Sequence, residues 1–226
     1  MIKRTFDIIA SGLGIILVLP LLCIVAVLIK LDSDGPILYC GKRVGKDGRI
    51  FKIFKFRTMV HNAELFGGSC TATKDPRITR IGKVLRKYKI DELPQLFNVF
   101  IGDMSLVGPR PDVEKYISTL CGDNRKILEL RPGITDWASV CNFQEGEILD
   151  CYEDPDEAYV NVILPVKLNL QMIYYNNHSL WIDLKIILFT FIKLFHRGWQ
   201  PELHMKPLLV ESGLAPQNIG FQSAKV

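Results

Sequence analysis

The chain has 226 residues, 48% of them hydrophobic, and a formal net charge of +4. That length supports one compact domain but is short for two. A charge this mild suits an anionic membrane surface or a nucleotide, and because no nucleic-acid-binding motif is present, we expect no nucleic-acid partner. The six cysteines stand without CxxC pairs or accompanying histidines, which indicates neither a zinc site nor a disulfide framework.

An apolar segment opens the chain. No charged residue occurs from position 8 to position 29, and Lys3 and Arg4 precede that run. The run is long enough to cross a bilayer, which takes roughly 20 apolar residues. Pro20 lies in its middle, however, where a proline removes a backbone hydrogen bond and kinks a helix. Two forms stay open: a spanning signal anchor, and a helix that bends at Pro20 and returns to the face it entered.

A β-hairpin is predicted over residues 37–56. The segments 37–39 and 49–56 flank a GKDG turn, whose Asp-Gly pair is typical of tight hairpins. Lys55 and Arg57 are two residues apart, so on a strand they share one face and would meet a phosphate or a lipid headgroup together. We predict that both bind substrate, with solvated strand-edge cations as the alternative.

A polar loop and a basic helix follow. Residues 61–80 contain two adjacent glycines and an Asp-Pro pair, which predict a mobile loop and then a turn. The next run carries Arg80, Lys83, Arg86 and Lys87 and leads into two adjacent carboxylates. Such runs are usually a solvated face. We expect Lys83 and Lys87 to face solvent or headgroups.

The stretch from Lys89 to Pro111, KIDELPQLFNVFIGDMSLVGPRP, carries the candidate site. A helix is predicted to begin with Asp91 as its N-cap, to hold Pro94 in its first turn and to end at Gly102. Its buried face is predicted from four apolar residues at the i, i+3, i+4, i+7 spacing: Leu93, Leu96, Phe97 and Phe100.

The residue types in this stretch favour a diphosphate site. The start of a helix attracts phosphate, and two adjacent carboxylates can hold a divalent cation such as Mg²⁺ that bridges it, so Asp91 and Glu92 are the predicted metal ligands. Arg110, fixed between two prolines, presents a guanidinium fork suited to bidentate phosphate contact. Taken singly, the same residues also fit a capping pair and a turn arginine.

Three further elements are predicted downstream. One helix is expected from residue 112 to about residue 130. In the apolar segment 179–197, Asp183, Thr190 and Arg197 recur every seven residues and mark a polar stripe. That pattern is typical of an amphipathic helix in the membrane interface, and packing on the domain is the alternative. Residues 198–226 show little periodicity and predict a loosely ordered tail.

Five segments together resemble one known family. They are KRTFDIIAS, GKDGRIFKIFKFRTM, DPRITRIGKVLRKYKIDELPQLFNVFIGDMSLVGPRP, RPGIT and SLWIDLKIIL, in that order over nearly the whole chain. They resemble the monotopic phosphoglycosyl transferases, bacterial enzymes that move a phospho-sugar from a UDP-sugar to polyprenyl phosphate and so start surface-glycan assembly. The resemblance implies a mostly helical α+β fold at the cytosolic face of the inner membrane: a re-entrant membrane helix (1–33), a catalytic domain (34–197) and a tail (198–226).

The resemblance also implies a mechanism and a set of site residues. Asp91 is the expected nucleophile and forms a covalent phospho-sugar intermediate, with Glu92 beside it and Mg²⁺ as the cofactor. Arg86, Arg110, Arg57 and Lys55 are the expected substrate-binding cations. The expected partners are a UDP-sugar, polyprenyl phosphate and membrane lipids, and a homodimer is left open.

Two departures from the family pattern are visible. Asp136-Trp137-Ala138-Ser139 stands where Gly-Trp-Ala-Gln is more frequent, and Gln171 stands where many relatives carry an aspartate, twelve residues before Asp183. The second departure leaves Asp91 and Glu92 as the metal-binding pair. It also keeps open a non-catalytic membrane scaffold of the same fold. A metal-dependent lipid diphosphatase would use similar residues and is the other alternative.

Overall fold

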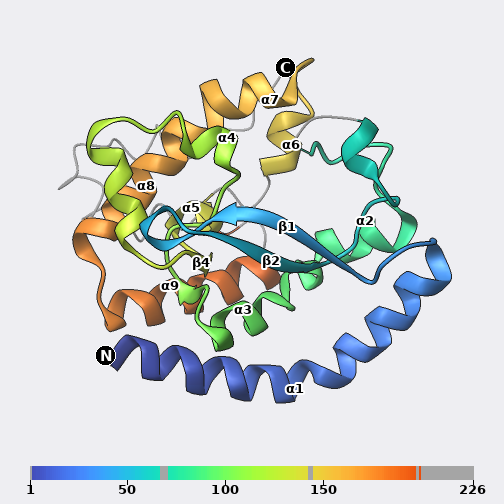
Figure 1. The fold of residues 1–226 in the computed structure, drawn as a ribbon, viewed down its shortest axis with the longest axis horizontal. Helices are drawn as coiled ribbons and strands as arrows, with labels where there is room; N and C mark the ends of the chain where they lie inside the picture. Colours follow the sequence, from blue (N-terminus) through green and yellow to red (C-terminus); the bar gives the residue numbers. More distant parts are fainter. Residues whose placement is uncertain (1, 67–70, 142–144, 197–198, 200–226) are drawn as a thin grey trace.

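The computed structural model describes residues 2–66, 71–141, 145–196 and 199. Its longest element is helix α1, Ile2–Asp32, which runs along one side of the molecule and bends along its course (Figure 1). Pro20 lies inside this helix. Helix α1 is long and apolar enough to cross a membrane, and only 17% of its most apolar stretch is buried. Most of that apolar surface is therefore left exposed by the protein.

The N-terminal end of α1 is held by charged side chains. Lys3 Nζ donates to the carboxylate of Asp183 at 2.5 Å, and Asp183 is only 1% exposed. Asp7 is buried as well, and its carboxylate accepts hydrogen bonds from the Ser105 hydroxyl (2.8 Å) and the Leu106 amide (3.1 Å). A buried carboxylate needs such partners, so these contacts fix the start of α1 on the domain.

The C-terminal end of α1 is held by the same protein body. The Asp32 carboxylate accepts a hydrogen bond from the Ile81 amide (3.1 Å) at the start of α2, Arg80–Lys87. Arg57 Nη2 donates to the Ser33 carbonyl just past the helix (2.6 Å). Both ends of the apolar helix are thus anchored to one domain.

The predicted β-hairpin is confirmed. Strands β1, Leu38–Val44, and β2, Ile50–Phe56, pair antiparallel. At the turn, Asp47 and Gly48 have φ of 55° and 76°, the left-handed conformation that Asp-Gly turns accommodate. Helix α3, Gln95–Ile101, lies between the hairpin and α1 (Figure 1). Its buried Asn98 joins α3 to the strand, accepting from the Phe54 amide and donating to the Lys52 carbonyl, each at 2.8 Å.

The main hydrophobic core surrounds a pair of short parallel strands. Strand β3, Ser105–Val107, pairs parallel with β4, Gly133–Thr135. Around this pair pack α5, Trp137–Cys141, α8, Leu164–Asn177, and α9, Leu180–Phe195. The short helices α4, Glu114–Ile117, α6, Glu145–Leu149, and α7, Pro155–Ala158, cover a second apolar cluster beside α8. The described part is therefore mostly helical with two small sheets, in agreement with the predicted α+β class.

The prediction of one helix from residue 112 to about 130 is wrong. Helix α4 ends at Ile117, and a 3₁₀ segment, Gly122–Glu129, replaces its continuation. Gly122, the first residue of that segment, has a φ of 56°, a left-handed conformation that a continuous right-handed helix does not contain. The predicted tail lies outside the described residues except for Trp199.

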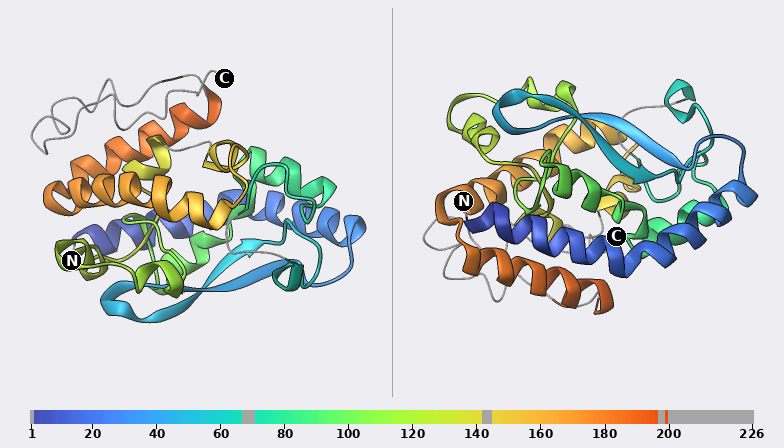
Figure 2. Two further views of the ribbon diagram at one scale, coloured as in Figure 1. Left: turned by 90° about the horizontal axis from the view of Figure 1, so that it is seen from above. Right: turned by 60° about the horizontal axis from the view of Figure 1, so that its bottom comes forward.

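Helix α9 is amphipathic, with its polar stripe buried and large apolar side chains exposed. Its polar stripe points into the protein, since Asp183 is buried and the Thr190 hydroxyl hydrogen-bonds the Thr135 hydroxyl at 2.7 Å. Its large apolar side chains Trp181 and Phe195 are 76% and 85% exposed. Helices α1 and α9 both lie on the underside of the molecule (Figure 2). The outer face that they form is apolar, unlike an ordinary soluble surface.

Candidate active site

The two adjacent carboxylates lie in a tight turn between α2 and α3. Lys89, with a φ of 56°, reverses the chain after α2, and Ile90–Glu92 forms one 3₁₀ turn. The prediction that Asp91 caps the helix is wrong, because Pro94 occupies the N-cap position of α3 and no side chain caps it. The Asp91 carboxylate is thereby left to face a cavity. Gly102, with a φ of 105°, ends α3 as predicted.

The predicted buried face of α3 is also wrong. Phe97 and Phe100 are 38% and 48% exposed, whereas Gln95, Asn98 and Val99 are buried. The apolar row turns toward α1 instead. A Cβ built on Gly14 of α1 would lie 3.4 Å from Leu96, and one built on Gly12 would lie 3.4 Å from Phe100. Periodicity found an apolar row, but this row is partly exposed and lies against α1. The four residues predicted to form the buried face were Leu93, Leu96, Phe97 and Phe100.

Glu92 is the centre of an ion cluster. Arg110 binds it through both ends of the guanidinium fork, with Nη1 donating to Oε2 at 3.0 Å and Nη2 donating to Oε1. Lys55 Nζ donates to Oε1 at 3.0 Å. Burial alone would raise the pKa of Glu92, but the charges of Arg110 and Lys55 outweigh it and hold that pKa well below its usual range. Burial lowers the pKa of Lys55. Two predicted substrate cations thus meet on one carboxylate.

Asp91 has the opposite environment. It is 8% exposed, and its Oδ1 is buried without a hydrogen-bond partner among the described residues. Burial, and then the negative charge of Glu92, raise the pKa of Asp91. A pair of carboxylates whose surroundings push their pKa values apart is typical of sites that give the two groups different tasks. Asp91 is the reactive member by this criterion, and Glu92 is the fixed charge.

Lys83, Arg86 and Lys87 of α2 all line the same cavity but differ in exposure, and which of them meets a phosphate stays a prediction. Arg86 is largely buried, lines the same cavity, and donates through Nε to the Thr58 hydroxyl at 2.9 Å. Burial lowers its pKa, yet a guanidinium remains charged near neutral pH. Within the described ranges its Nη groups make no further hydrogen bond, so they are available to an anion. Lys83 and Lys87 are exposed.

Arg57 does not join this cluster. It follows β2 and turns to the end of α1, where it donates to backbone oxygens of Ser33 and Asp34. Gly35 is required beside it, since its φ is 116° and a Cβ there would lie 2.1 Å from Arg57 Nη1. Lys55 and Arg57 therefore meet different partners, and a direct role of Arg57 in substrate binding stays a prediction.

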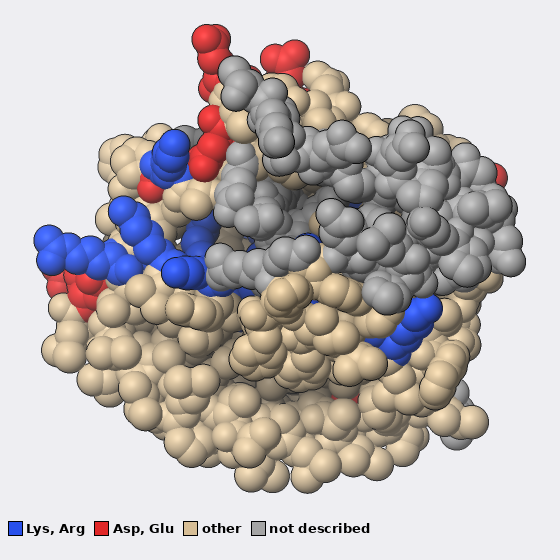
Figure 3. Space-filling model, turned by 180° about the vertical axis from the view of Figure 1, so that it is seen from behind, with Lys and Arg blue, Asp and Glu red and all other residues tan. Residues whose placement is uncertain are grey.

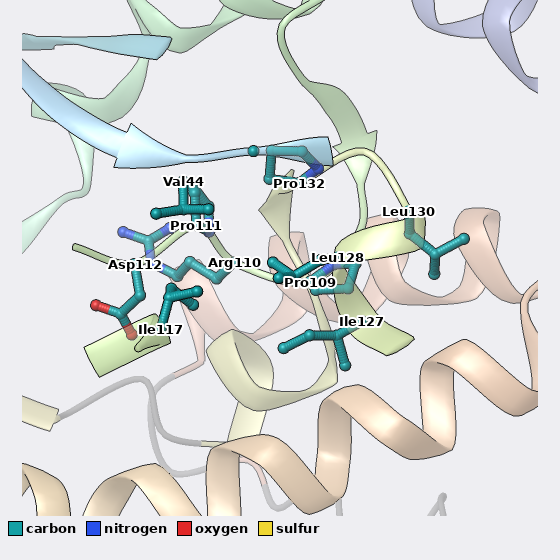
Figure 4. A pocket seen from close by; sticks show the side chains of 11 residues that line it. Val44, Pro109, Arg110, Pro111, Asp112, Ile117, Ile127, Leu128, Leu130 and Pro132 are labelled. Atoms are coloured by element: carbon teal, nitrogen blue, oxygen red, sulfur yellow. The ribbon is translucent and has the colours of Figure 1, made fainter. Parts of the chain in front are cut away.

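The GPRP turn is built by close backbone packing. A Cβ on Gly108 would lie 2.3 Å from the Arg131 carbonyl oxygen, so only glycine allows this approach. Figure 4 shows proline and aliphatic side chains around the turn, with Arg110 extending away from Leu130. The cavity between them measures about 20 Å³, room for about one water but not for a substrate. The turn thus serves to aim Arg110.

A second cavity, of about 2100 Å³, holds the candidate site. Asp91, Glu92, Arg86 and Lys55 are among the side chains of its polar part. Its apolar part is lined by side chains of α1 and α9: Phe6, Ala10, Leu17, Leu184, Ile187 and Phe191. One space therefore connects a carboxylate and cation cluster with the two outward-apolar helices.

The cavity also contains a polar group that the sequence did not point to. Lys167 Nζ donates to Asp112 Oδ2 and to the Tyr159 hydroxyl, each at 2.7 Å. Burial would raise the pKa of Asp112, but Lys167 outweighs it and lowers that pKa. Tyr159 opens a π-helical turn, Tyr159–Ile163, a form of backbone that is frequent at functional sites. The ion pair joins residues 55 positions apart, and no local pattern links them.

The residues present fit a magnesium ion bound together with a phosphate. Within the described ranges no three His, Cys, Asp or Glu side chains gather as a ligand group. Mg²⁺ needs only one or two carboxylates, because phosphate oxygens and water complete its shell. A carboxylate oxygen of Asp91 would be one such ligand, and Glu92 lies beside it with both of its oxygens engaged by cations.

Comparisons with known proteins show the family of the chain. The profile of the family described as bacterial sugar transferase matches residues 1–197. The chain is 41% identical over 194 residues to a UDP-N-acetylgalactosamine-undecaprenyl-phosphate N-acetylgalactosaminephosphotransferase of Aeromonas hydrophila, covering 84% of this chain and 42% of that protein. It is 41% identical over 203 residues to an undecaprenyl-phosphate glucose phosphotransferase of Komagataeibacter xylinus, covering 83% and 35%.

A third relative has a similar length. The exopolysaccharide production protein PSS of Rhizobium leguminosarum bv. phaseoli is 35% identical over 204 residues, which cover 87% of this chain and 96% of that protein. The chain thus spans less than half the length of the first two relatives but nearly all of the third. With a profile match over most of its residues, the chain belongs to the bacterial sugar transferase family.

Proposed function

We propose that this protein transfers a phospho-sugar from a UDP-sugar to a polyprenyl phosphate such as undecaprenyl phosphate, releasing UMP. The observation that carries the proposal is the contrast between Asp91 and Glu92. One carboxylate is buried and unpartnered in the large cavity, and its neighbour is locked by Arg110 and Lys55. The names of two relatives support the acceptor, since both include undecaprenyl phosphate.

The reaction is proposed to run in two displacements at one phosphorus. A carboxylate oxygen of Asp91 bonds to the β-phosphorus, and the bond from that phosphorus to the bridging oxygen breaks, so UMP leaves with this oxygen. An oxygen of the polyprenyl phosphate then bonds to the same phosphorus, and the bond to Asp91 breaks. The products are polyprenyl diphosphate sugar and a regenerated carboxylate. Carboxylates serve as phosphoryl nucleophiles in other enzymes.

Asp91 is suited to the first displacement by its surroundings. Burial raises the pKa of Asp91, which indicates a more basic carboxylate. Arg86 and Arg110 supply cationic donors around the same space, which stabilise charge on the phosphate oxygens. When bound, Mg²⁺ would further neutralise the diphosphate.

The membrane arrangement is proposed to be re-entrant. A helix that spans the bilayer leaves its ends on opposite faces, but Lys3 at one end of α1 and Asp32 at the other both bind the same domain. In Figure 3 the lower part of the visible face is almost free of charge, and Lys and Arg gather in a band above it. This pattern supports an apolar base in the lipid with a basic rim at the headgroups.

The two membrane-facing helices also explain how the substrates meet. The cavity extends from the apolar side chains of α1 and α9 to the carboxylates, so a polyprenyl chain in the lipid can bring its phosphate to Asp91. A UDP-sugar is water-soluble and is made in the cytosol, which favours the cytosolic face of the inner membrane for the domain.

The test is UMP release from a panel of UDP-sugars by protein in nanodiscs with Mg²⁺ and undecaprenyl phosphate. We expect release with one or a few donors, its loss in Asp91→Asn, and its loss after the metal is removed with a chelator and recovery when Mg²⁺ is restored. Without acceptor, intact-mass measurement should show one phospho-sugar on the wild-type chain and none on Asp91→Asn. Release of free phosphate instead would indicate a lipid diphosphatase, and a folded but inactive protein would indicate a scaffold.

A further inference from the structure

Two buried polar side chains lie behind Arg110 and contact each other. Asp136 is 0% exposed and Gln171 is 2% exposed. Gln171 Nε2 donates to Asp136 Oδ2 at 3.0 Å, across 35 positions of sequence. The structure thus joins them as one buried pair.

The Asp136 carboxylate organises the turn that carries Arg110. Its Oδ2 also accepts from the Arg110 amide at 3.1 Å, while Oδ1 accepts from the amide and the hydroxyl of Ser139, each at 2.6 Å. Two positions before Asp136, the Ile134 carbonyl accepts from Arg110 Nη1 at 2.9 Å. The segment from β4 to α5 therefore holds both the backbone and the side chain of the arginine that grips Glu92.

We propose that Asp136 is a positioning residue for Arg110, and that Gln171 is an amide because the carboxylate of this buried pair is supplied from position 136. Together the two side chains carry one negative charge, on Asp136, and one amide donor, on Gln171. A carboxylate at both positions would set two buried like charges about 3 Å apart, which is strongly unfavourable. An amide at position 136 weakens the acceptor of the Arg110 amide.

The pairing makes an unusual mutational prediction. Gln171→Glu keeps the shape of the side chain and adds a charge beside Asp136, so it should be harmful by itself. Asp136→Asn should be harmful to a lesser degree. The double variant removes the repulsion between the two charges and should recover part of the loss, so Gln171→Glu should be less harmful in Asp136→Asn than in the native chain. Recovery is not complete, because an amide at position 136 cannot accept from the amides of both Arg110 and Ser139.

The experiment is this double-mutant cycle read by melting temperature and by kcat and KM for UMP release, the second readout resting on the proposed function. We expect Gln171→Glu to lower kcat/KM by about tenfold or more, and the double variant to lose less than the sum of the two single losses, as contacting residues can couple to this extent. The same cycle in an Arg110→Lys background should retain the coupling in melting temperature and lose the coupling in kcat/KM.

A matched control separates positioning from general destabilisation. Asp154 caps α7 by accepting from the amides of Asp156 (2.9 Å) and Glu157 (3.1 Å), outside the cavity lining. Asp154→Ala should lower the melting temperature and leave kcat and KM unchanged.

Three outcomes would overturn the proposal: additive losses in the double variant, coupling in melting temperature alone, or kinetic coupling that persists in Arg110→Lys. An inactive wild-type protein would refute the proposed function instead, and the melting temperatures would still decide whether the pair shares one charge.

Discussion

Asp91 and Glu92 are neighbours in the chain, yet removing their charges should move the stability of the protein in opposite directions. Burial and the charge of Glu92 raise the pKa of Asp91 in the folded protein. A group whose pKa is higher folded than unfolded costs stability when it ionises, so at neutral pH the Asp91 charge destabilises the fold. Asp91→Asn removes this charge and should stabilise the protein while abolishing turnover.

The magnitude follows from the contacts of each side chain. An unpartnered buried polar group costs about 1–3 kcal/mol, and because Asn keeps a polar group at the site, we expect Asp91→Asn to gain about 1 kcal/mol. For a chain of this size that is about 2–4 °C in melting temperature. Glu92→Gln leaves Arg110 and Lys55 facing a neutral amide. Breaking a buried ion cluster in this way costs about 3–5 kcal/mol.

The assay is differential scanning fluorimetry of the three proteins in the same nanodiscs, with UMP release measured in parallel. Both variants should lose turnover, but only Asp91→Asn should melt above the wild type. If Asp91→Asn melted below the wild type, or Glu92→Gln melted above it, the assignment of a reactive and a fixed carboxylate would be refuted.

The remaining predictions concern pH, the cations of α2 and the membrane helix. Turnover should fall as the pH drops through the raised pKa of Asp91, which a pH–rate profile checks. Over the same pH range the extra stability of Asp91→Asn should vanish, because protonated Asp91 no longer carries the destabilising charge. Melting curves of both proteins check this second result. Arg86→Ala should lower kcat/KM by about 10²-fold or more. Lys83 is exposed, so Lys83→Ala should change kcat/KM by less than about twofold. Equal losses in the two variants would indicate a folding effect. Pro20→Ala should favour a straight α1 that spans the membrane. A thiol introduced by Ile2→Cys should then be labelled from outside spheroplasts only when Pro20→Ala is also present. Labelling of Ile2→Cys without Pro20→Ala would contradict the re-entrant arrangement.

The parts of the fold that depend on local chemistry were predictable from sequence. The hairpin follows from an Asp-Gly turn between apolar segments, and the end of α3 follows from Gly102. The face of α3 was not predictable, because its neighbour is α1, some eighty positions earlier, and periodicity does not say which element an apolar row will contact. For the same reason, the sequence could not show that the polar stripe of α9 faces the protein, since the ion pair between Asp183 and Lys3 is visible only in the packed structure.

The candidate site shows the same division. Asp91, Glu92 and Arg110 belong to one continuous motif, and the structure brings Glu92 and Arg110 together. Lys167 and Asp112 could not be paired beforehand, because a lysine in an apolar helix gives no signal of its partner. A buried Asn98 in an otherwise apolar segment was a usable signal, since an uncharged polar residue at such a position predicts a hydrogen-bonded contact to another element.

The contact between α3 and the two glycines of α1 has a mechanical consequence. Leu96 and Phe100 approach α1 where Gly12 and Gly14 leave no side chain, and the turn bearing Asp91 leads directly into the same helix. In the proposed arrangement, a thicker or thinner bilayer shifts α1 at modest energetic cost, and α3 shifts with it. The nucleophile is thus connected to lipid thickness through a few closely packed atoms, and the acyl-chain length of the surrounding lipid becomes a determinant of turnover.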